Sequence, residues 1–334
     1  MNNTFKVALV GCGTICTNHF NALARLDNVT VVAICDKIAD RAEAAKAKFS
    51  LDARIYTDYD LMLASEKLDA VHICTPHYLH APMAIAALER NVNVFLEKPI
   101  CISTDEINAL IAAEAASRAS VCVCFQNRFN PSVALAEQLC EEDGGVMSAY
   151  GSVFWYRSEK YYTESGWRGT YATEGGGVMI NQAIHTIDLL CKFLGKPVTV
   201  CATKANHHLK GVIEVEDTCE GVIGFESGKA ANFYATTSFD GRDSTIVYLV
   251  TAKKRTVMIN QSKVYLDGVQ IDRPELVTDY VGKECYGNGH VTLIAKFYSA
   301  LVTGDKMPVT LESAQYALRI LLAAYRSDDQ QIDI

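Results

Sequence analysis

Short apolar runs alternate with helix-like stretches through the first third of the chain, and this pattern constrains the fold more than any other feature. Apolar, β-branched segments predict buried strands at residues 5–10, 29–35, 54–57, 70–74, 91–96 and 121–125. Strands that alternate with helices in this way form right-handed βαβ units. The sequence therefore predicts an α/β fold in which residues 1–126 form a doubly wound parallel sheet.

A glycine turn follows the first of these strands. The segment Gly11-Cys12-Gly13-Thr14-Ile15-Cys16 comes directly after Val10 and leads into a predicted helix. In a dinucleotide-binding turn, Gly11 would make the tight turn and Gly13 would let the backbone approach a pyrophosphate at the helix N-terminus. Cys16 occupies the third glycine position, where it is small but a departure from the pattern. A lone Gly-x-Gly is weak evidence, but its strand–turn–helix context favours a nucleotide site.

An acidic residue stands at the end of the second strand. Asp36 lies about 20 residues beyond the glycine turn, the spacing expected of an acid that bonds the adenosine ribose. Such an acid repels a 2′-phosphate, so we expect NAD as the cofactor. Lys37 and Arg41 weaken that preference because either could pair with a phosphate, and NADP is left open. Alternatively, Asp36 caps the helix that follows.

Several later strands also end in polar or turn residues. Thr75 and Pro76 follow one strand, Lys98 and Pro99 follow the next, and residues 126–128 follow the last. The carboxyl ends of parallel strands meet at one edge of a sheet, and ligands bind there. Cofactor binding along that edge explains all of them together, which makes Lys98 the leading catalytic candidate. By itself, a strand-end lysine is more often an inert, solvated residue.

Length, charge and cysteine content limit the remaining possibilities. A chain of 334 residues suits two domains, so we expect a second domain at residues 127–334. The net charge of −8, without a long basic block, argues against nucleic acid or an anionic membrane as a partner. No signal peptide or apolar run of about 20 residues is visible. The 12 cysteines contain no Cys-x-x-Cys pair and are expected to be buried thiols of a cytoplasmic protein, without a metal site.

The second domain has a different sequence texture. A helix is predicted to about residue 142, a strand at 146–156, and β segments from 198 onward, with turns at 226–229 and 266–269. These segments predict a large, mostly antiparallel sheet, which makes this an α+β domain. An amphipathic helix pair, at about 290–303 and 311–326, is expected to close the chain, with only the last few residues disordered.

A glycine run precedes the most informative helix of this domain. Three glycines, Gly175–Gly177, permit close backbone approach, and the helix after them carries Asn181, His185 and Asp188 within about 60° of one another. His185 is the natural acceptor for a substrate proton, because imidazole titrates near neutral pH. Asn181 would bond a hydroxyl, and Asp188 would orient the imidazole. The alternative is a core histidine bonded to Asp188.

These motifs together resemble the glucose–fructose oxidoreductase/inositol dehydrogenase (Gfo/Idh/MocA) family over essentially the whole chain. The resemblance implies an NAD(P)-dependent oxidoreductase that acts on a sugar, sugar derivative or cyclitol. It also implies a Rossmann domain and a second domain whose open sheet forms the interface of a homodimer or homotetramer. The residues that carry it are Gly11-x-Gly13, Thr75-Pro76 with His80, Glu97-Lys98-Pro99, Gly175-Gly176-Gly177 with His185 and Asp188, and Gly287-Asn288-Gly289-His290.

Roles follow from the resemblance residue by residue. Lys98 and His185 match the catalytic lysine and histidine, whereas Asn181 stands where many members have aspartate. An amide can bind a hydroxyl but cannot act as a base, which puts a Lys/Asp/His relay in doubt. The expected cofactor-binding residues are Gly11, Gly13, Thr14, Ile15, Asp36, Lys37, Thr75, Pro76, His80, Glu97, Lys98, Asn127 and Arg128. The expected substrate-binding residues are Lys98, Arg157, Tyr161, Trp167, Arg168, Asn181 and His185.

The function predicted from these residues is hydride transfer between a nicotinamide and a secondary hydroxyl. A second hypothesis retains the NAD: transient oxidation of a sugar permits elimination and re-reduction, giving a glycosidase or lyase. A third is an NAD-binding sensor without turnover, which the presence of both Lys98 and His185 disfavours.

Overall fold

The computed structural model describes residues 4–241, 243–273, 276 and 287–334, and these form two compact units. The first unit comprises Met1–Gln126 and His290–Ser313, and the second comprises Asn127–Gly289 and Ala314–Ile334. The division after Gln126 coincides with the expected boundary. Residues 290–313, however, pack with the first unit, although we expected them in the second.

A six-stranded parallel sheet forms the centre of the first unit, in the order β3-β2-β1-β4-β5-β6. This is the strand order of a dinucleotide-binding Rossmann fold, and it confirms the predicted doubly wound sheet. The strands are β1 (Phe5–Val10), β2 (Val29–Cys35), β3 (Arg54–Tyr56), β4 (Ala70–Ile73), β5 (Asn93–Leu96) and β6 (Val121–Val123).

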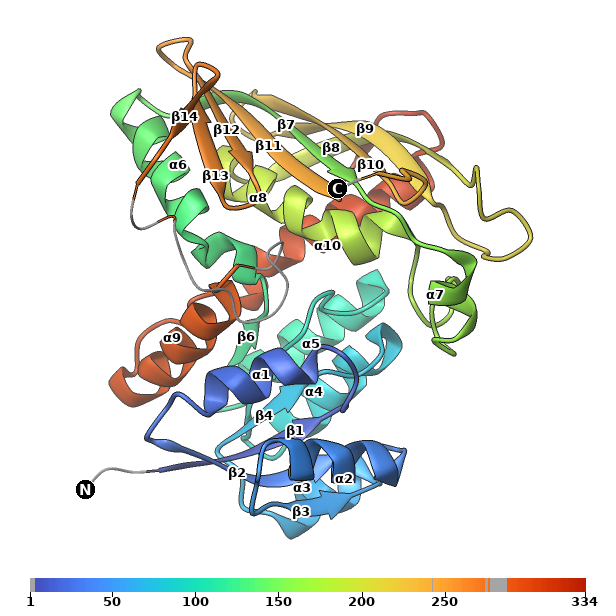
Figure 1. The fold of residues 1–334 in the computed structure, drawn as a ribbon, viewed down its shortest axis with the longest axis vertical. Helices are drawn as coiled ribbons and strands as arrows, with labels where there is room; N and C mark the ends of the chain where they lie inside the picture. Colours follow the sequence, from blue (N-terminus) through green and yellow to red (C-terminus); the bar gives the residue numbers. More distant parts are fainter. Residues whose placement is uncertain (1–3, 242, 274–275, 277–286) are drawn as a thin grey trace. The chain divides into compact units, whose positions relative to one another are not determined.

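Helices cover both faces of this sheet. The helices are α1 (Cys16–Leu23), α2 (Ala39–Lys48), α3 (Tyr59–Ser65), α4 (His80–Leu88), α5 (Thr104–Ala116) and α9 (Gly289–Thr303). In Figure 1, α1 and α9 lie in front of the sheet and α4 and α5 lie behind it. Rings explain why α9 belongs to this unit: Phe297 packs edge-on against Phe95 of β5, and Tyr298 stacks on His72 of β4. An amphipathic pattern alone does not indicate which sheet a helix will cover.

The second unit is built on a nine-stranded sheet in the order β14-β13-β12-β11-β7-β10-β9-β8-β15. Its neighbours pair antiparallel except β7 and β10, which are parallel. The strands are β7 (Val146–Phe154), β8 (Pro197–Ala205), β9 (Thr218–Phe225), β10 (Ala230–Thr236), β11 (Ser244–Thr251), β12 (Thr256–Asn260), β13 (Lys263–Leu266), β14 (Val269–Ile271) and β15 (Ile332–Asp333). The expected disorder of the last residues is wrong, because Ile332 and Asp333 pair with β8.

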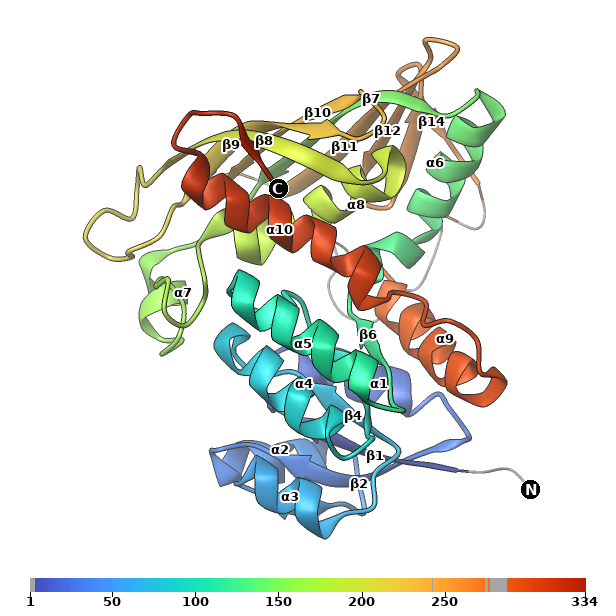
Figure 2. The ribbon, with the colours of Figure 1, turned by 180° about the vertical axis from the view of Figure 1, so that it is seen from behind.

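Helices cover one face of the nine-stranded sheet. They are α6 (Pro131–Glu142), α8 (Ile184–Leu194) and α10 (Leu311–Ser327), with the short α7 (Glu159–Thr163) outside the sheet. Figures 1 and 2 show α6, α8 and α10 on the same side of the strands, and in the described part of the chain no helix covers the other side. The predicted turns are present: Gly228 has a positive φ in one, and Asp267 and Gly268 have positive φ in the other. Among the described residues, no helix has both the length and the hydropathy of a membrane span.

Candidate active site

The glycine turn after β1 has the geometry of a dinucleotide cradle. Gly11 has φ +91°, and a Cβ there would lie 2.6 Å from the carbonyl carbon of Cys74, so only glycine fits. A Cβ on Gly13 would meet nothing within 4 Å, which leaves open space over the backbone. The eight-residue helix α1 begins at Cys16 and has no acidic residue in its first turn. These features fit a pyrophosphate at the N-terminus of α1.

Asp36 follows β2 and is fixed against this turn. Its carboxylate accepts a hydrogen bond from the Cys12 N–H at 2.7 Å and another from the Ile38 N–H at 2.8 Å. It is only 8% exposed. Because α2 begins at Ala39, Asp36 shapes the connection before the helix instead of serving as its N-cap. The acid therefore lies beside the glycine turn, where a ribose contact requires it, and that contact stays a prediction.

His80, which stays a predicted cofactor-binding residue, joins two strand ends. Its Nδ1 lies 2.6 Å from the carbonyl oxygen of Pro99 and its Nε2 lies 2.8 Å from that of Thr75. The imidazole is buried, and burial lowers its pKa, so the ring is neutral and donates to one carbonyl at a time. His80 thus holds the segment after β4 against the segment after β5, which carries Lys98 and the cis Lys98–Pro99 bond. This contact shapes the sheet edge where we expect the nicotinamide.

Glu97, which precedes Lys98, ends a buried chain of hydrogen bonds. Its Oε1 lies 2.9 Å from His19 Nε2, and its Oε2 accepts from the Lys98 N–H at 3.2 Å. His19 Nδ1 then meets His72 Nδ1 at 2.9 Å, and His72 Nε2 meets the Tyr298 hydroxyl at 2.8 Å. The chain links α1, β4, β5 and α9, all in the first unit.

The protonation states of this chain follow from its connectivity. Burial raises the pKa of Glu97, but the hydrogen bond from His19 and the His290 imidazole 3.7 Å away outweigh that effect and bring it well below its usual value. Burial holds the pKa of His72 well below its usual value, so that imidazole is neutral. With Glu97 ionised, His19 donates to Glu97, and the neutral His72 ring donates at one of its nitrogens and accepts at the other. The result is a buried carboxylate beside the Lys98 backbone.

Three potential metal ligands meet at the same place. Ligand atoms of His19, Glu97 and Cys124 lie within 4.8 Å of one another. The first two are already hydrogen-bonded, and burial raises the pKa of the Cys124 thiol well above its usual value, which keeps the proton on sulfur. These three side chains therefore fit a hydrogen-bonded cluster better than a metal site, because a metal ligand must be a thiolate and Cys124 keeps its proton.

In the second unit, the space left by the missing side chains of the glycine run is filled by other residues of the same unit. A Cβ on Gly176 would overlap the hydroxyl of Tyr325, and a Cβ on Gly177 would overlap the carbonyl oxygen of Glu216. Glu216 also accepts hydrogen bonds from the Gly177 N–H and the Tyr325 hydroxyl, both at 3.0 Å. The glycines thus allow the start of the helix to pack directly against the buried Glu216.

The helix after the glycines differs from the expected regular one. Met179–Ala183 is a π-helical turn, and α8 starts only at Ile184. Asp188 was expected to orient the His185 imidazole, but its two oxygens accept from Arg128, at 2.8 Å from Nε and 2.5 Å from Nη2. Burial raises the pKa of Asp188, and the Arg128 guanidinium acts against that rise. Arg128, whose place at the cofactor stays a prediction, forms this buried ion pair within its own unit.

Asn181 has a partner that the sequence reasoning missed. Its Nδ2 donates to Glu174 Oε1 at 2.5 Å, and the Tyr161 hydroxyl lies 3.4 Å from the same nitrogen. Glu174 Oε2 accepts from the Gly169 N–H at 2.6 Å. The carboxyl is 1% exposed, and burial raises its pKa to about 7. The sequence signal that could have indicated this partner is the position of Glu174 directly before the glycine run.

Most of the expected substrate-binding side chains gather around Tyr161. The Arg168 guanidinium lies 4.4 Å from the centre of the Tyr161 ring, and that of Arg157 lies 5.1 Å from it. Arg168 also lies over Trp167, at 4.6 Å, and Asn181 reaches the Tyr161 hydroxyl. Cation–π contacts of this kind fix guanidinium groups in place. The result is a cationic, aromatic cluster on the segment that leads to the glycine run.

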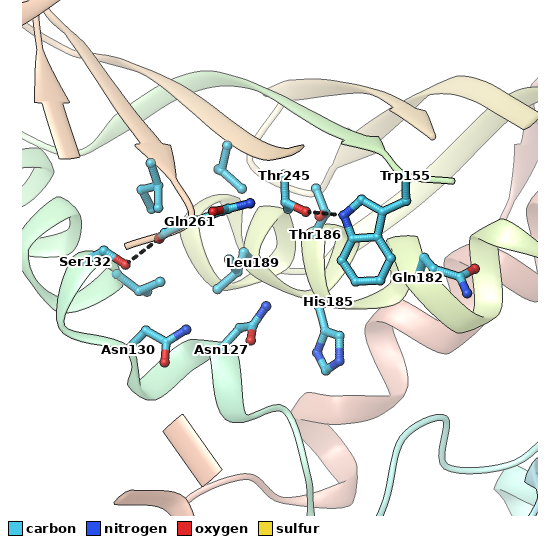
Figure 3. Close-up of a pocket in the computed structure, with 13 residues that line it drawn as sticks. Asn127, Asn130, Ser132, Trp155, Gln182, His185, Thr186, Leu189, Thr245 and Gln261 are labelled. Carbon is cyan, nitrogen blue, oxygen red and sulfur yellow. Dashed lines mark hydrogen bonds between the residues drawn. The ribbon is translucent and has the colours of Figure 1, made fainter. Parts of the chain in front are cut away.

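His185 lines a small cavity between α6, α8 and the strands. Figure 3 shows its imidazole projecting from α8 on the side away from Trp155 and Thr245. The lining residues are Asn127, Asn130, Ser132, Val133, Trp155, Gln182, His185, Thr186, Leu189, Thr245, Val247, Ile259 and Gln261. At 50 Å³ the cavity is far below the size of a ligand pocket.

Comparisons with known proteins identify the class to which this fold and site belong. Residues 5–126 match the model of the oxidoreductase family with an NAD-binding Rossmann fold, and residues 141–256 match the GFO/IDH/MocA C-terminal domain. The first unit is therefore built on an NAD-binding Rossmann domain. The chain belongs to the Gfo/Idh/MocA family of NAD-dependent oxidoreductases, which confirms the resemblance.

Individual relatives are distant. Inositol 2-dehydrogenase of Salmonella typhimurium is 35% identical over 129 residues, and this match spans 38% of each chain. Inositol 2-dehydrogenase of Rhizobium meliloti is 26% identical over 343 residues, which covers 99% of both chains. Among solved structures, the WlbA dehydrogenase of Bordetella pertussis, in complex with NADH and UDP-GlcNAcA, superposes with a TM-score of 0.88 at 25% identity. That superposition covers 99% of this chain and 98% of the other.

Proposed function

We propose that the protein transfers a hydride between NAD and a secondary hydroxyl of a sugar, sugar derivative or cyclitol. The observation that carries this proposal is the pairing of two features in one chain. A glycine cradle with Asp36 against it fits the dinucleotide. A polar helix with His185 and Asn181 offers a hydroxyl-binding group and a base. NAD, when bound, supplies the hydride acceptor, and NADP is the alternative that Lys37 and Arg41 leave open.

Lys98 and His185 are the proposed acid–base groups. Lys98, protonated, would stabilise the alkoxide-like oxygen, and His185 would accept the hydroxyl proton. The Glu97 carboxylate supports this role for Lys98 by position, because it accepts a hydrogen bond from the Lys98 N–H and so fixes the backbone of Lys98 at the strand end. Asn181 would hold the hydroxyl in place. Its amide cannot accept the proton, which makes His185 the main acceptor.

The residues proposed to contact the cofactor lie at the carboxyl-terminal edge of the parallel sheet. Gly11, Gly13, Thr14 and Ile15 would hold the pyrophosphate, and Asp36 would hold the ribose. At the nicotinamide end, Thr75, Pro76 and Lys98 would make direct contact. Glu97, His80 and Arg128 would act indirectly, because their described partners lie within the protein.

The cluster around Tyr161 supports a substrate that carries an acidic group. Arg157 and Arg168 lie on this ring with their guanidinium groups held in place, and such groups bind carboxylate or phosphate in forked geometry. Aromatic faces at Tyr161 and Trp167 suit the C–H faces of a sugar ring. The WlbA structure holds UDP-GlcNAcA, which agrees with this direction. We therefore favour an acidic sugar derivative over a neutral cyclitol.

The uncovered face of the nine-stranded sheet supports assembly into a homodimer or homotetramer. Tyr248 pairs with Tyr150, which in turn pairs with Asn232, and Asn232 pairs with Val222. Large apolar side chains in this row are exposed: 37% for Tyr150, 44% for Val222 and 37% for Tyr248. An exposed sheet face with several large apolar side chains of this kind supports an interaction surface.

The decisive experiment is a substrate panel assayed for NADH formation with NAD and with NADP. The panel contains myo-inositol, neutral sugars, levoglucosan, uronic acids and UDP-GlcNAcA. We expect NADH to accumulate, with acidic sugars preferred, and an Arg168→Met variant to lose that preference while still oxidising a neutral sugar. Product without free NADH would instead support the NAD-retaining glycosidase or lyase. Tight NAD binding without any turnover would support the sensor.

A further inference from the structure

A buried carboxyl is connected to the cationic, aromatic cluster around Tyr161. Gly169, the residue after Arg168, donates its N–H to Glu174 Oε2 at 2.6 Å. Asn181 Nδ2 donates to Glu174 Oε1 at 2.5 Å and lies 3.4 Å from the Tyr161 hydroxyl. The Arg168 guanidinium lies over the ring of that tyrosine, 4.4 Å from its centre. Glu174 and Arg168 are therefore joined both through the backbone and through Asn181 and Tyr161.

The two arginines of this cluster differ in their other contacts. Arg157 Nη1 donates to the Tyr156 carbonyl at 2.7 Å and lies 3.8 Å from Asp243 Oδ2. The Arg168 guanidinium has no acceptor or ion-pair partner among the described residues, although its Nε is buried. Its side chain is half-buried, so an anion can reach it. A buried donor without an acceptor needs an explanation, and an acidic group of a ligand provides one.

Glu174 responds to charge at Arg168 because it is buried. The carboxyl is 1% exposed, and burial raises its pKa to about 7. The two hydrogen bonds that it accepts and the positive charge of Arg168 lower the pKa, whereas the carboxyl of Glu216 adds to the rise. The titratable and charged groups around Glu174 are Arg168, Glu216, Tyr161 and Tyr162. Among these four, Arg168 is the cation.

A carboxylate bound to Arg168 would cancel the charge that favours the ionised form of Glu174. It would also displace water from the cluster, which makes every remaining charge interaction stronger. Both effects favour the neutral carboxyl. One charge a few ångströms away in a protein changes the affinity for a proton about tenfold.

We propose that Arg168 and Glu174 form a proton-linked anion site, in which Glu174 takes up a proton from solvent when a carboxylate of the substrate binds Arg168. The inference rests on the acidic substrate proposed above. One negative charge arrives with the ligand and one is neutralised, so the charge of the cluster stays the same. Glu174 thereby determines specificity: its neutral form favours an acidic sugar and its ionised form disfavours one.

The pH dependence has a definite sign. Well below about pH 7, Glu174 already carries its proton, and the acidic sugar binds without proton uptake. As the pH rises through about 7, binding requires a proton that is no longer present, so it weakens. For a tenfold rise in proton affinity, about half a proton is taken up at about pH 7.5, and the ligand affinity falls about eightfold between about pH 6 and pH 9.

Calorimetric titration of the full chain with NADH bound measures this proton, when it is repeated at about pH 7.5 in buffers of different ionisation enthalpy. The probes are UDP-GlcNAcA and UDP-GlcNAc, which differ in the sugar carboxylate, and with NADH bound neither is oxidised. We expect uptake of about half a proton with UDP-GlcNAcA and none with UDP-GlcNAc. Glu174→Gln, which imitates the neutral carboxyl, should abolish the uptake and bind UDP-GlcNAcA equally well at all these pH values.

Arg168→Met tests the same coupling without a ligand, because it removes the guanidinium charge that a bound carboxylate would cancel. NMR titration of glutamate-labelled full-length protein, assigned with Glu174→Gln, measures proton binding to the Glu174 carboxyl. We expect Arg168→Met to strengthen proton binding about tenfold. Lys160→Met, a matched control that removes an exposed cation of α7, should change it less than twofold.

Absence of proton uptake with UDP-GlcNAcA, or equal proton binding in Arg168→Met and Lys160→Met, would overturn the proposal. If both effects are found but no sugar of the substrate panel yields NADH, the proton-linked site stands and the proposed dehydrogenase function fails. If the panel yields NADH but UDP-GlcNAcA brings no proton, the dehydrogenase function stands and the proton-linked site fails.

Discussion

Glu174 makes the most specific prediction about stability. This carboxyl is almost fully buried and accepts hydrogen bonds from the Gly169 N–H and the Asn181 amide. Burial raises its pKa from 4.5 to about 7, and the nearby Glu216 adds to the rise. Folding therefore favours the protonated form. Its contribution to stability is fully present below about pH 4.5 and is lost as the pH rises through about 7.

The magnitude follows from this pKa. A tenfold change in proton affinity corresponds to about 1.4 kcal/mol, so the full contribution is about 3 kcal/mol. Between about pH 5.5 and pH 8, about 2 kcal/mol of it disappears. Glu174→Gln imitates the protonated carboxyl at every pH and should remove this part of the pH dependence.

Intrinsic fluorescence reports on the right unit, because the chain's 2 tryptophans, Trp155 and Trp167, both lie in the second unit. Denaturant unfolding at several pH values gives the free energy for wild type and Glu174→Gln. We expect wild type to lose about 2 kcal/mol relative to Glu174→Gln between about pH 5.5 and pH 8. Glu220→Gln, an exposed control on β9, should behave as wild type. Parallel curves for wild type and Glu174→Gln would refute the reasoning.

Three further predictions concern other buried groups. Arg128→Met leaves Asp188 buried without its cation and should cost about 3–5 kcal/mol in unfolding free energy, whereas Arg128→Met with Asp188→Leu should recover at least half of that loss. Asp36→Asn should weaken NAD binding and reduce discrimination against NADP in a calorimetric titration; unchanged selectivity would remove its ribose role. His72→Leu interrupts the buried chain to Glu97 and leaves two polar groups unpartnered, so thermal unfolding should show a loss of about 2–4 kcal/mol, and an unchanged stability would contradict the hydrogen-bonded chain.

Local signals explain how much of the fold was predictable. Strands β1 and β2 begin and end where their apolar runs predicted, and Ser103 caps α5 locally, with its hydroxyl accepting from the Glu106 N–H. These features depend on residues a few positions apart. The family motifs likewise placed Lys98 at a strand end and His185 on a helix after the glycine run.

Long-range pairings account for what the sequence did not reveal. His19 and Glu97 are 78 residues apart, and Arg128 and Asp188 are 60 apart, so neither periodicity nor motif spacing pairs them. The expectation that Asp188 orients His185 followed from helix geometry alone. It overlooked a buried carboxylate's need for a cation, which Arg128 meets.

The glycine run was interpreted correctly as a place of close approach, but the approaching groups could not be identified. Gly176 and Gly177 make room for Tyr325 and Glu216, which come from distant parts of the second unit. Their contact seats the helix that carries His185. The glycine run therefore positions the helix that carries His185. The sequence could not reveal this role, because Tyr325 of α10 and Glu216 are far from the glycines along the chain.

The central claim is that Lys98 and His185 perform the acid–base chemistry of NAD-dependent hydroxyl oxidation. Single-turnover NADH formation from the best substrate of the panel, in wild type, Lys98→Met and His185→Gln, tests it most directly. We predict that each variant loses about 10²–10⁴-fold in rate while NAD binding changes little. Near-wild-type rates in either variant, with NAD still bound, would contradict the account.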